Sequence, residues 1–443
     1  MDRADVVVVG AGLAGLACAF ELASAGREVL LLEGRPHLGG RTASWVEDGM
    51  PVESGLHRYL GFYDALRGLL QRAGVSVNDI IVWEDVVEIR TPDGPRGVFG
   101  VAPFFRPLTT LASLLGNNAL LSPLDKLSLI PMLGRGLLEY ALRPARLDRR
   151  SALGYARRNL ATRRAQRRFV EPFSTGLFFL PPERYSAYAF LMPFAYALRR
   201  LTRVRVGAFR GGMSEVMADP LAAAIARRGG VVQAGAPVER LRIARGRVTG
   251  VEIPGAAIEA RHVVVATSLR PAQRLLAQLA GHPWARPMLS LPSMPVVTIQ
   301  LELDRPSMPY DRTTFGPGTA LASFAEQSRT TFRHAPGRLS VILGRPERFL
   351  AATPEEILAV TVRDAAKLGI DLEGHVRSFR VVTLLDDFYS LAPGKDHLRP
   401  GQVTPIPGLT LAGDYTRQPL LGTMEGAVIS GQLAARAVLA GGA

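Results

Sequence analysis

Several features that would narrow the function are missing from this 443-residue chain. It has one cysteine, Cys18, so it can form no internal disulfide and no cysteine metal site. Its seven histidines show none of the close spacings that hold a metal, and we expect no metal. No uncharged apolar run reaches the ~18 residues of a membrane span. No signal peptide precedes the first strand-like residues at Val6, so we expect the protein to stay in the cytoplasm.

Lysine is almost absent as well. Only three residues, Lys126, Lys367 and Lys395, are lysines among 53 basic residues, and the net charge is +14. The arginine excess has two interpretations, a GC-rich genome or a surface that meets an anionic partner such as lipid or nucleic acid. No nucleic-acid-binding module is visible and the aromatic residues do not alternate with the arginines, so we expect no nucleic-acid partner.

A strand, a glycine-rich turn and a helix open the chain. Residues 5–9 predict a buried strand, the turn Gly10-Ala-Gly-Leu-Ala-Gly15 follows, and a second strand ends at Glu33. In such a βαβ unit the first glycine permits the tight turn, the second lets the backbone approach a pyrophosphate, and the third lets the helix pack on the strand. A carboxylate at Glu33 can accept both ribose hydroxyls. The pattern predicts a dinucleotide cofactor.

Two further segments favour FAD over NAD. Gly39-Gly40 lets the chain pass close to a cofactor, and Arg41 offers a guanidinium fork for phosphate oxygens. Following the fingerprint at this distance, these residues are typical of FAD proteins of the amine-oxidase type. Near the other end, Asp414 can bind ribityl or phosphate-linked groups, and a helix that starts near Met424 can direct its N–H groups at the flavin.

The middle of the chain is apolar and then rich in arginine. Residues 100–142 are apolar with helical period, and residues 143–168 carry a dense run of arginines. One interpretation is a segment that lies in a membrane interface, which would make the protein peripheral on the inner face of the cell membrane. The other is a helical subdomain with a solvated basic face.

Longer segments resemble one family. Residues 399–435 are similar to the C-terminal signature of the plant- and cyanobacterial-type phytoene and zeta-carotene desaturases, which belong to the FAD-dependent amine-oxidase-like superfamily. Residues 53–63 resemble the family's segment after its Gly-Gly-Arg/Lys motif, and residues 171–173, 181–186 and 322–328 resemble its middle. Arg41 and Thr423 depart mildly, since the family usually has lysine and serine there.

The motifs and the resemblance together imply the site residues. The cofactor would contact Gly10, Gly12, Ala14, Gly15, Glu33, Gly34, Arg35, Gly39, Gly40, Arg41, Leu56, His57, Tyr63, Val238, Asp414 and Met424. A substrate-site arginine of the family falls at Arg199, or at Arg200 with a different gap. No catalytic side chain is assigned, because the flavin is the redox centre.

The expected fold class is α/β, a Rossmann-like FAD-binding domain of the GR2 or amine-oxidase type with an interleaved α+β substrate domain. We expect a discontinuous FAD-binding domain of residues 1–95, 205–290 and 400–443. A helical, membrane-facing substrate subdomain of residues 96–204 and a β-rich substrate domain of residues 291–399 would complete the chain.

The resemblance implies an FAD-dependent oxidoreductase that desaturates a long apolar isoprenoid such as phytoene or another carotene. A hydride would pass to flavin N5, and the allylic charge left behind would be delocalised, so a strong protein base is not required. Only one dinucleotide fingerprint is present, which favours reoxidation by a quinone or oxygen. The alternatives are another isoprenoid flavoenzyme (a hydroxysqualene dehydroxylase or carotenoid isomerase), an amine oxidase, and an FAD-stabilised membrane scaffold.

Apolar and aromatic side chains crowd one stretch of the sequence. They are Phe173, Leu177, Phe178, Phe179, Leu180, Phe190, Met192, Phe194 and Tyr196. Such crowding is typical of an ordinary core, but a polyene can be held only by shape. We therefore predict an apolar tunnel lined by residues 173–200 and 296–326.

Overall fold

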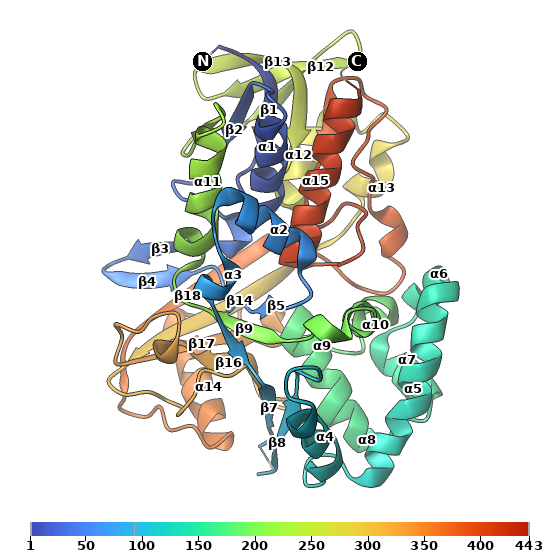
Figure 1. The fold of residues 1–443 in the computed structure, drawn as a ribbon, viewed down its shortest axis with the longest axis vertical. Helices are drawn as coiled ribbons and strands as arrows, with labels where there is room; N and C mark the ends of the chain where they lie inside the picture. The colour runs from blue at the N-terminus through green and yellow to red at the C-terminus, as the bar shows by residue number, and fades with distance from the viewer. Residues whose placement is uncertain (1, 93, 442–443) are drawn as a thin grey trace.

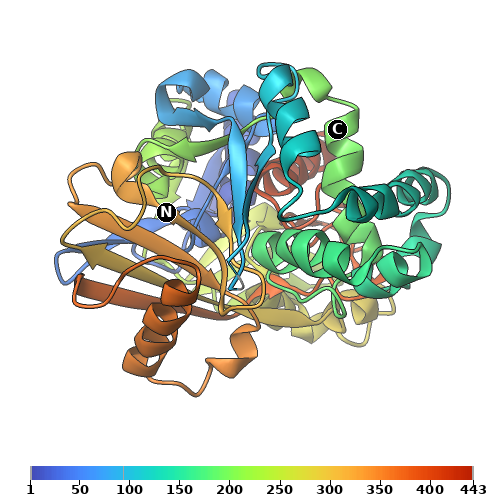
Figure 2. The same ribbon diagram turned by 90° about the horizontal axis from the view of Figure 1, so that it is seen from below.

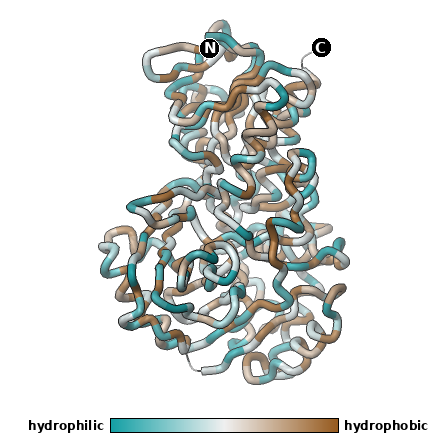
Figure 3. Tube along the Cα trace, turned by 60° about the vertical axis from the view of Figure 1, so that its left-hand side comes forward, coloured by the Kyte–Doolittle hydropathy of each residue, from teal (hydrophilic) through white to brown (hydrophobic). Residues whose placement is uncertain are grey.

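The computed structural model describes residues 2–92 and 94–441 and has two lobes (Figures 1 and 3). The upper lobe surrounds one sheet and contains the beginning and the end of the chain. Hydrophobic residues gather along its central strands in Figure 3. In the lower lobe, a second sheet and a group of helices lie side by side, as Figure 2 shows from below.

The sheet of the upper lobe runs in the order β10-β2-β1-β13-β12-β11, with β19 beside β13. Its strands are β1 (Arg3–Val9), β2 (Val29–Leu32), β10 (Val231–Gln233), β11 (Arg240–Ala244), β12 (Arg247–Ile253), β13 (Ala256–Val265) and β19 (Leu409–Leu411). β10, β2, β1, β13 and β19 are parallel, whereas β12 and β11 add an antiparallel edge. Helices connect the parallel strands, as expected of a dinucleotide-binding fold.

Both faces of this sheet are covered, which explains the unbroken valine run of β1. Val6 and Val8 share a core with α1 (Leu13–Ser24), α11 (Asp219–Ala226) and α15 (Met424–Ala440). Val7 and Val9 lie in a second core with residues of α12 (Leu269–Leu276). Parallel strands buried on both faces lose the alternation of polar and apolar residues.

The second sheet runs in the order β18-β14-β17-β16-β15-β7-β8. Its strands are β7 (Val86–Arg90), β8 (Arg96–Gly100), β14 (Ser293–Leu303), β15 (Thr314–Phe315), β16 (Leu321–Glu326), β17 (Gly337–Leu343) and β18 (Val376–Tyr389). The expected domain boundary at residue 95 therefore falls inside the β7–β8 hairpin. This boundary is wrong because β7 pairs in parallel with β15, which moves the chain into the second sheet by residue 86.

The two faces of β14 serve different purposes. Val297, Ile299 and Leu301 pack in a core with α14 (Pro354–Lys367) on the outer face. Val296 and Thr298 alternate with them and line a large cavity on the inner face.

The helical part of the lower lobe follows β8. Its helices are α4 (Pro107–Gly116), α5 (Pro123–Leu142), α6 (Pro144–Asp148), α7 (Ala152–Arg158), α8 (Arg163–Ala165), α9 (Glu171–Phe178) and α10 (Ala187–Leu198). α5 begins with a capping box between Ser122 and Asp125, and Ser186 caps α10. None of the described helices is both long enough and apolar enough to cross a membrane.

Smaller elements complete the described part of the chain. They are β3 (Ser44–Glu47), β4 (Met50–Glu53), β5 (Tyr59–Leu60), β6 (Ile81–Glu84), β9 (Val206–Phe209), α2 (Asp64–Ala73), α3 (Val77–Ile80) and α13 (Ala285–Leu289). β5, β9 and β6 form a separate small sheet.

A buried polar junction lies at the end of β4. The backbone N–H of Glu53 donates to Gln300 Oε1 at 3.0 Å, and Gln327 Nε2 donates to Glu53 Oε2 at 3.1 Å. The fully buried Arg338 donates from Nη2 to the same Gln300 oxygen at 2.6 Å. Burial raises the pKa of Glu53 to about 7 and lowers the pKa of Arg338 to about 10.

This junction predicts a pH dependence of stability. Folded Glu53 keeps its proton up to about pH 7, whereas the unfolded chain releases it near the ordinary value of 4.5, so the free energy of unfolding falls as the pH rises between these values. We expect Glu53→Gln to lessen this fall by ~1–3 kcal/mol. Urea titrations at pH 5 and pH 8 measure it. The same fall in wild type and variant would contradict the assignment to Glu53.

Candidate functional site

One large cavity extends from the upper sheet into the lower lobe. Its volume is about 1250 Å³, above the ~300–1,000 Å³ of an ordinary small-molecule site. The turn after β1, the loop of residues 33–41 and residues 413–427 line one half of it. Residues of α9 and α10 and the inner face of the second sheet line the other half. These are called the cofactor half and the substrate half below.

The structure brings nearly all the expected cofactor residues to this cavity. Gly10, Gly12, Ala14, Glu33, Gly34, Arg35, Gly39, Gly40, Arg41, Leu56, His57, Tyr63, Val238, Asp414 and Met424 line it. Gly15 does not line it and instead lies beneath the turn. A Cβ on Gly15 would lie 1.8 Å from the carbonyl oxygen of Gly10, so this glycine serves the close packing of α1 on the strand.

The glycine turn leaves room for a phosphate. Gly10 has a φ of +101°, and a Cβ there would lie 3.0 Å from Thr267 Cα. A Cβ on Gly12 would meet nothing within 4 Å, so open space remains above the N-terminus of α1. A Cβ on Gly40 would lie 3.2 Å from Gly12 Cα, which holds the second loop against the first. The turn therefore fits a pyrophosphate at a helix N-terminus.

Glu33 is held ready for a ribose. Its Oε2 accepts the N–H of Ala11 at 2.7 Å, and its Oε1 accepts the N–H of Arg35 at 3.0 Å. A carboxylate offers about four lone-pair positions, so two remain for ribose hydroxyls. The backbone that follows β1 and β2 thus fixes the carboxylate where a dinucleotide needs it.

Arg41 and Asp414 come from opposite ends of the chain and form an ion pair. Arg41 Nη2 donates to Asp414 Oδ1 at 2.5 Å, and the guanidinium lies 4.5 Å from the ring centroid of Phe388. The carbonyl oxygen of Arg41 accepts His57 Nε2 at 2.9 Å. Burial lowers the pKa of His57 to about 4, so its ring is neutral at pH 7 and Nε2 is the donor.

The N-terminus of α15 is fixed by two side chains. Thr423 Oγ1 accepts the N–H of Gly426 at 3.0 Å. Glu425 does not line the cavity; its carboxylate accepts the first N–H groups of α2, from Ala65 and Leu66, both at 2.8 Å. Burial raises the pKa of Glu425 to about 7. Glu425 therefore positions α2, and with it the neighbouring Tyr63 on the cavity wall.

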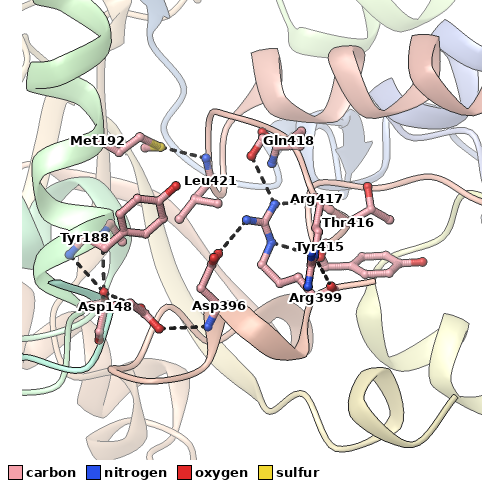
Figure 4. A network of polar contacts seen from close by, with 12 residues as sticks. Asp148, Tyr188, Met192, Asp396, Arg399, Tyr415, Thr416, Arg417, Gln418 and Leu421 are labelled. Carbon is pink, nitrogen blue, oxygen red and sulfur yellow. Dashed lines mark hydrogen bonds and ion pairs between the residues drawn. The ribbon is translucent and has the colours of Figure 1, made fainter. Parts of the chain in front are cut away.

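A buried arginine that the sequence did not single out fixes the loop after Asp414 (Figure 4). Arg399 donates to the carbonyl oxygens of Tyr415 at 3.3 Å, Thr416 and Gln418 at 3.4 Å, and to Asp396 Oδ1 at 2.8 Å. The only local signal was its place at the start of the segment that resembles the desaturases.

The same network reaches the helical part of the lower lobe. The N–H of Asp396 donates to Asp148 Oδ2 at 3.2 Å, and Ser186 Oγ donates to Asp148 Oδ1 at 2.7 Å. Because Ser186 caps α10, whose residues line the substrate half, Arg399 and Asp148 connect the two halves of the cavity.

The substrate half is mainly apolar. Among the crowded residues of the sequence, Phe173, Leu177, Phe178, Phe179, Met192 and Phe194 line it. Leu180, Phe190 and Tyr196 pack outside its wall. The sheet contributes Val296, Thr298, Thr313, Phe315, Ser323 and Ile342. Arg58 also lines this half, and its charge is paired with Glu84 at 2.8 Å and with Asp311.

The structure does not bring Arg199 to the cavity. Arg199 is exposed at the C-terminal end of α10, where the helix has turned its side chain away from the wall. The alternative, Arg200, does not line the cavity either. Arg200 pairs with Asp64 at 2.9 Å and lies 3.9 Å from the ring centroid of Tyr196. Their positions correct the expectation of a substrate-binding arginine at this point.

Comparisons with known proteins agree with this geometry. The family model described as flavin containing amine oxidoreductase matches residues 13–439. A 15-cis-phytoene desaturase of Synechococcus elongatus is 29% identical over 98% of this chain and 96% of its own length. A protein of the same organism named "Probable zeta-carotene desaturase" is 28% identical over 98% of both chains. The solved structure of putrescine oxidase bound to putrescine covers 99% of both chains with a TM-score of 0.74 and 18% identity, a likeness of fold.

The Arg399 network gives a testable expectation. Arg399→Gln removes the donor to three buried carbonyl oxygens, so we expect the free energy of unfolding to fall by ~1–3 kcal/mol and FAD affinity to fall with it. Arg417→Gln is the matched control: it loses the same charge in the same loop, but among the described residues exposed Arg417 donates to one carbonyl oxygen, that of Arg399 at 3.0 Å, and Arg399 to three. Denaturant titrations and flavin-fluorescence titrations of the apoprotein measure both effects. Equal effects of the two substitutions would contradict the role of Arg399.

Proposed function

The chain belongs to the flavin-containing amine oxidoreductase family, and we propose that it is an FAD-dependent desaturase of a long apolar isoprenoid such as phytoene or another carotene. The observation that carries the proposal is the apolar substrate half, which continues into the cofactor half within one cavity. A polyene has no polar group to bind, so only such a shaped apolar space can hold it.

The expected fold, the FAD cofactor and the oxidoreductase class are confirmed by the family match, and the desaturase relatives confirm the resemblance. The residues present fit the cofactor, because the open space at Gly12 and the spare lone pairs of Glu33 match a pyrophosphate and a ribose. When bound, FAD supplies an acceptor for a hydride from carbon.

The lining of the substrate half supports an apolar substrate. Its wall is mainly aromatic and aliphatic, and the charge of Arg58 is paired with Glu84 and Asp311. Asp386 and Asp387 of β18 also line the cavity, but they pair with Arg270 at 3.7 Å and with Arg35 at 3.2 Å. A long aliphatic chain fits such a wall without a polar partner.

The side chains of the substrate half act by shape. Phe173, Phe178 and Phe194 exclude water and hold an extended chain in one orientation beside the cofactor half, which supplies the positional part of catalysis. The neutral ring of His57 adds no charge near the substrate. A quinone or oxygen is the proposed oxidant that returns the cofactor to its working state.

Pigment analysis tests this function directly. We expect the protein, expressed in cells that accumulate phytoene, to yield more unsaturated carotenes. Phe194→Asp places a charge on the wall and is expected to lower turnover by ~10²-fold or more while FAD stays bound. Leu198→Asp, exposed on the same helix, is the control and is expected to keep activity. Full activity of Phe194→Asp, or turnover of small amines in place of phytoene, would overturn the proposal.

We also propose that the protein binds the membrane peripherally, on its inner face, through α4 and the outer side of α5. α4 has no buried side chain. The exposed apolar side chains of this surface are Phe104, Phe105, Leu108, Leu111, Leu114, Leu115, Leu124, Leu127, Ile130, Leu138 and Leu142. Exposed apolar side chains gathered on two successive helices are typical of a lipid or protein contact, and arginines of residues 143–168 follow them in the sequence.

Vesicle flotation tests the membrane contact. Leu108 and Leu115 are 80% and 63% exposed, so their replacement by aspartate removes apolar contact without opening the core. We expect the double variant Leu108→Asp/Leu115→Asp to lose at least ~10-fold in partitioning, since each leucine contributes ~1.5–3 kcal/mol when buried. Wild-type protein that stays wholly in the lipid-free fraction at low salt would remove the proposal.

A further inference from the structure

Arg205 lies where the cavity wall meets the exposed apolar surface. It precedes β9 and lines the cavity. Its guanidinium lies between two aromatic rings, 4.7 Å from the centroid of Trp83 and 4.3 Å from that of Phe105. Phe105 is 46% exposed and lies two residues before the start of α4. Arg205 therefore joins the interior of the cavity to the surface proposed to face lipid.

The charge of Arg205 has no counter-ion among the described residues. Its side chain makes no hydrogen bond or ion pair in this part of the chain, and its buried Nε has no partner. The neighbouring arginines differ, because Arg203 pairs with Asp64 and Arg106 pairs with Asp85 at 3.4 Å. Asp85 pairs with Arg106, so its negative charge acts on Arg205 only at longer range. An arginine stays charged at all ordinary pH values, so the charge of Arg205 is not neutralised by a contacting carboxylate among the described residues.

The setting of this guanidinium indicates which anion it takes. Two aromatic faces hold the plane of the guanidinium, which leaves its N–H edge for a ligand with oxygen acceptors. The planar fork of arginine matches the oxygens of a phosphate. In a protein that rests on lipid through α4, the phosphate at this depth is that of a phospholipid headgroup.

We propose that Arg205 is a phosphate-binding residue at the edge of the cavity and takes the headgroup phosphate of an anionic membrane phospholipid. The assignment rests on the proposed membrane contact. It places one lipid headgroup beside Phe105, so that the cavity is held against the bilayer at this point and an apolar substrate passes from lipid to cavity next to the bound headgroup.

Flotation with three proteins and two kinds of vesicle, phosphatidylcholine alone and phosphatidylcholine with phosphatidylglycerol, tests the assignment. The proteins are the FAD-loaded wild type, Arg205→Gln and Arg203→Gln. The two variants lose the same charge two residues apart, but among the described residues Arg205 is unpaired and Arg203 is paired with Asp64. On phosphatidylcholine vesicles with phosphatidylglycerol, we expect Arg205→Gln to bind about fivefold more weakly than wild type. We expect Arg203→Gln to lose less than about twofold. The flavin spectrum of each protein confirms that it is folded.

The outcomes separate this inference from the membrane proposal. Equal losses for the two variants, with wild type bound, would overturn the role of Arg205 and leave the membrane contact standing. Wild type that binds neither vesicle would overturn both. Inorganic phosphate at constant ionic strength provides the last arm, read from the change in tryptophan fluorescence, to which Trp83 beside the guanidinium contributes. A saturable response that Arg205→Gln lacks, together with vesicle binding that the variant keeps, would identify free phosphate as the ligand and overturn the lipid assignment.

Discussion

The close packing of α1 against α15 is the constraint on which the cofactor half depends. A Cβ on Gly431 would lie 2.2 Å from the carbonyl oxygen of Ala14, so the two helix backbones touch at this glycine. α1 follows the turn at Gly10 and Gly12, and α15 follows the loop that carries Asp414. The contact therefore fixes the phosphate turn relative to the C-terminal loop, and it allows Arg41 and Asp414 to pair across the chain.

Local motifs made the cofactor half predictable from the sequence, because each motif carries its own backbone geometry. Gly10 needs its positive φ for the turn, and Glu33 follows β2 directly, so its position relative to the turn is set by the parallel register of β1 and β2. The crowded stretch within residues 173–200 was informative in part, because six of its nine apolar and aromatic side chains line the cavity and the other three pack outside its wall. In both segments a few neighbouring residues supply the chemistry of that part of the site.

The connections between the lobes could not be predicted, because their partners are far apart in the sequence. Glu53 meets Gln300 across 247 residues and Gln327 across 274. β7 and β15, whose pairing places the domain boundary before residue 95, also lie far apart in the sequence, since Glu88 faces Thr314. Arg199 failed for a different reason: α10 ends at Leu198, so Arg199 and Arg200 both lie beyond the helix whose residues line the wall, and Arg200 pairs with Asp64.

Residues 104–142 show why periodicity alone did not separate a lipid-facing surface from a packed subdomain. In α5, Leu129 and Met132 are buried, whereas Leu127 and Ile130 are 61% and 62% exposed, so apolar side chains occupy both sides of the helix. Apolar area left in water gives no hydrophobic stabilisation until another apolar phase covers it. If that phase is the bilayer, the apolar surface outside reaches the cavity wall at Phe105, whose ring contacts Arg205 of that wall. A substrate without polar groups would then pass from lipid to the cavity without crossing water.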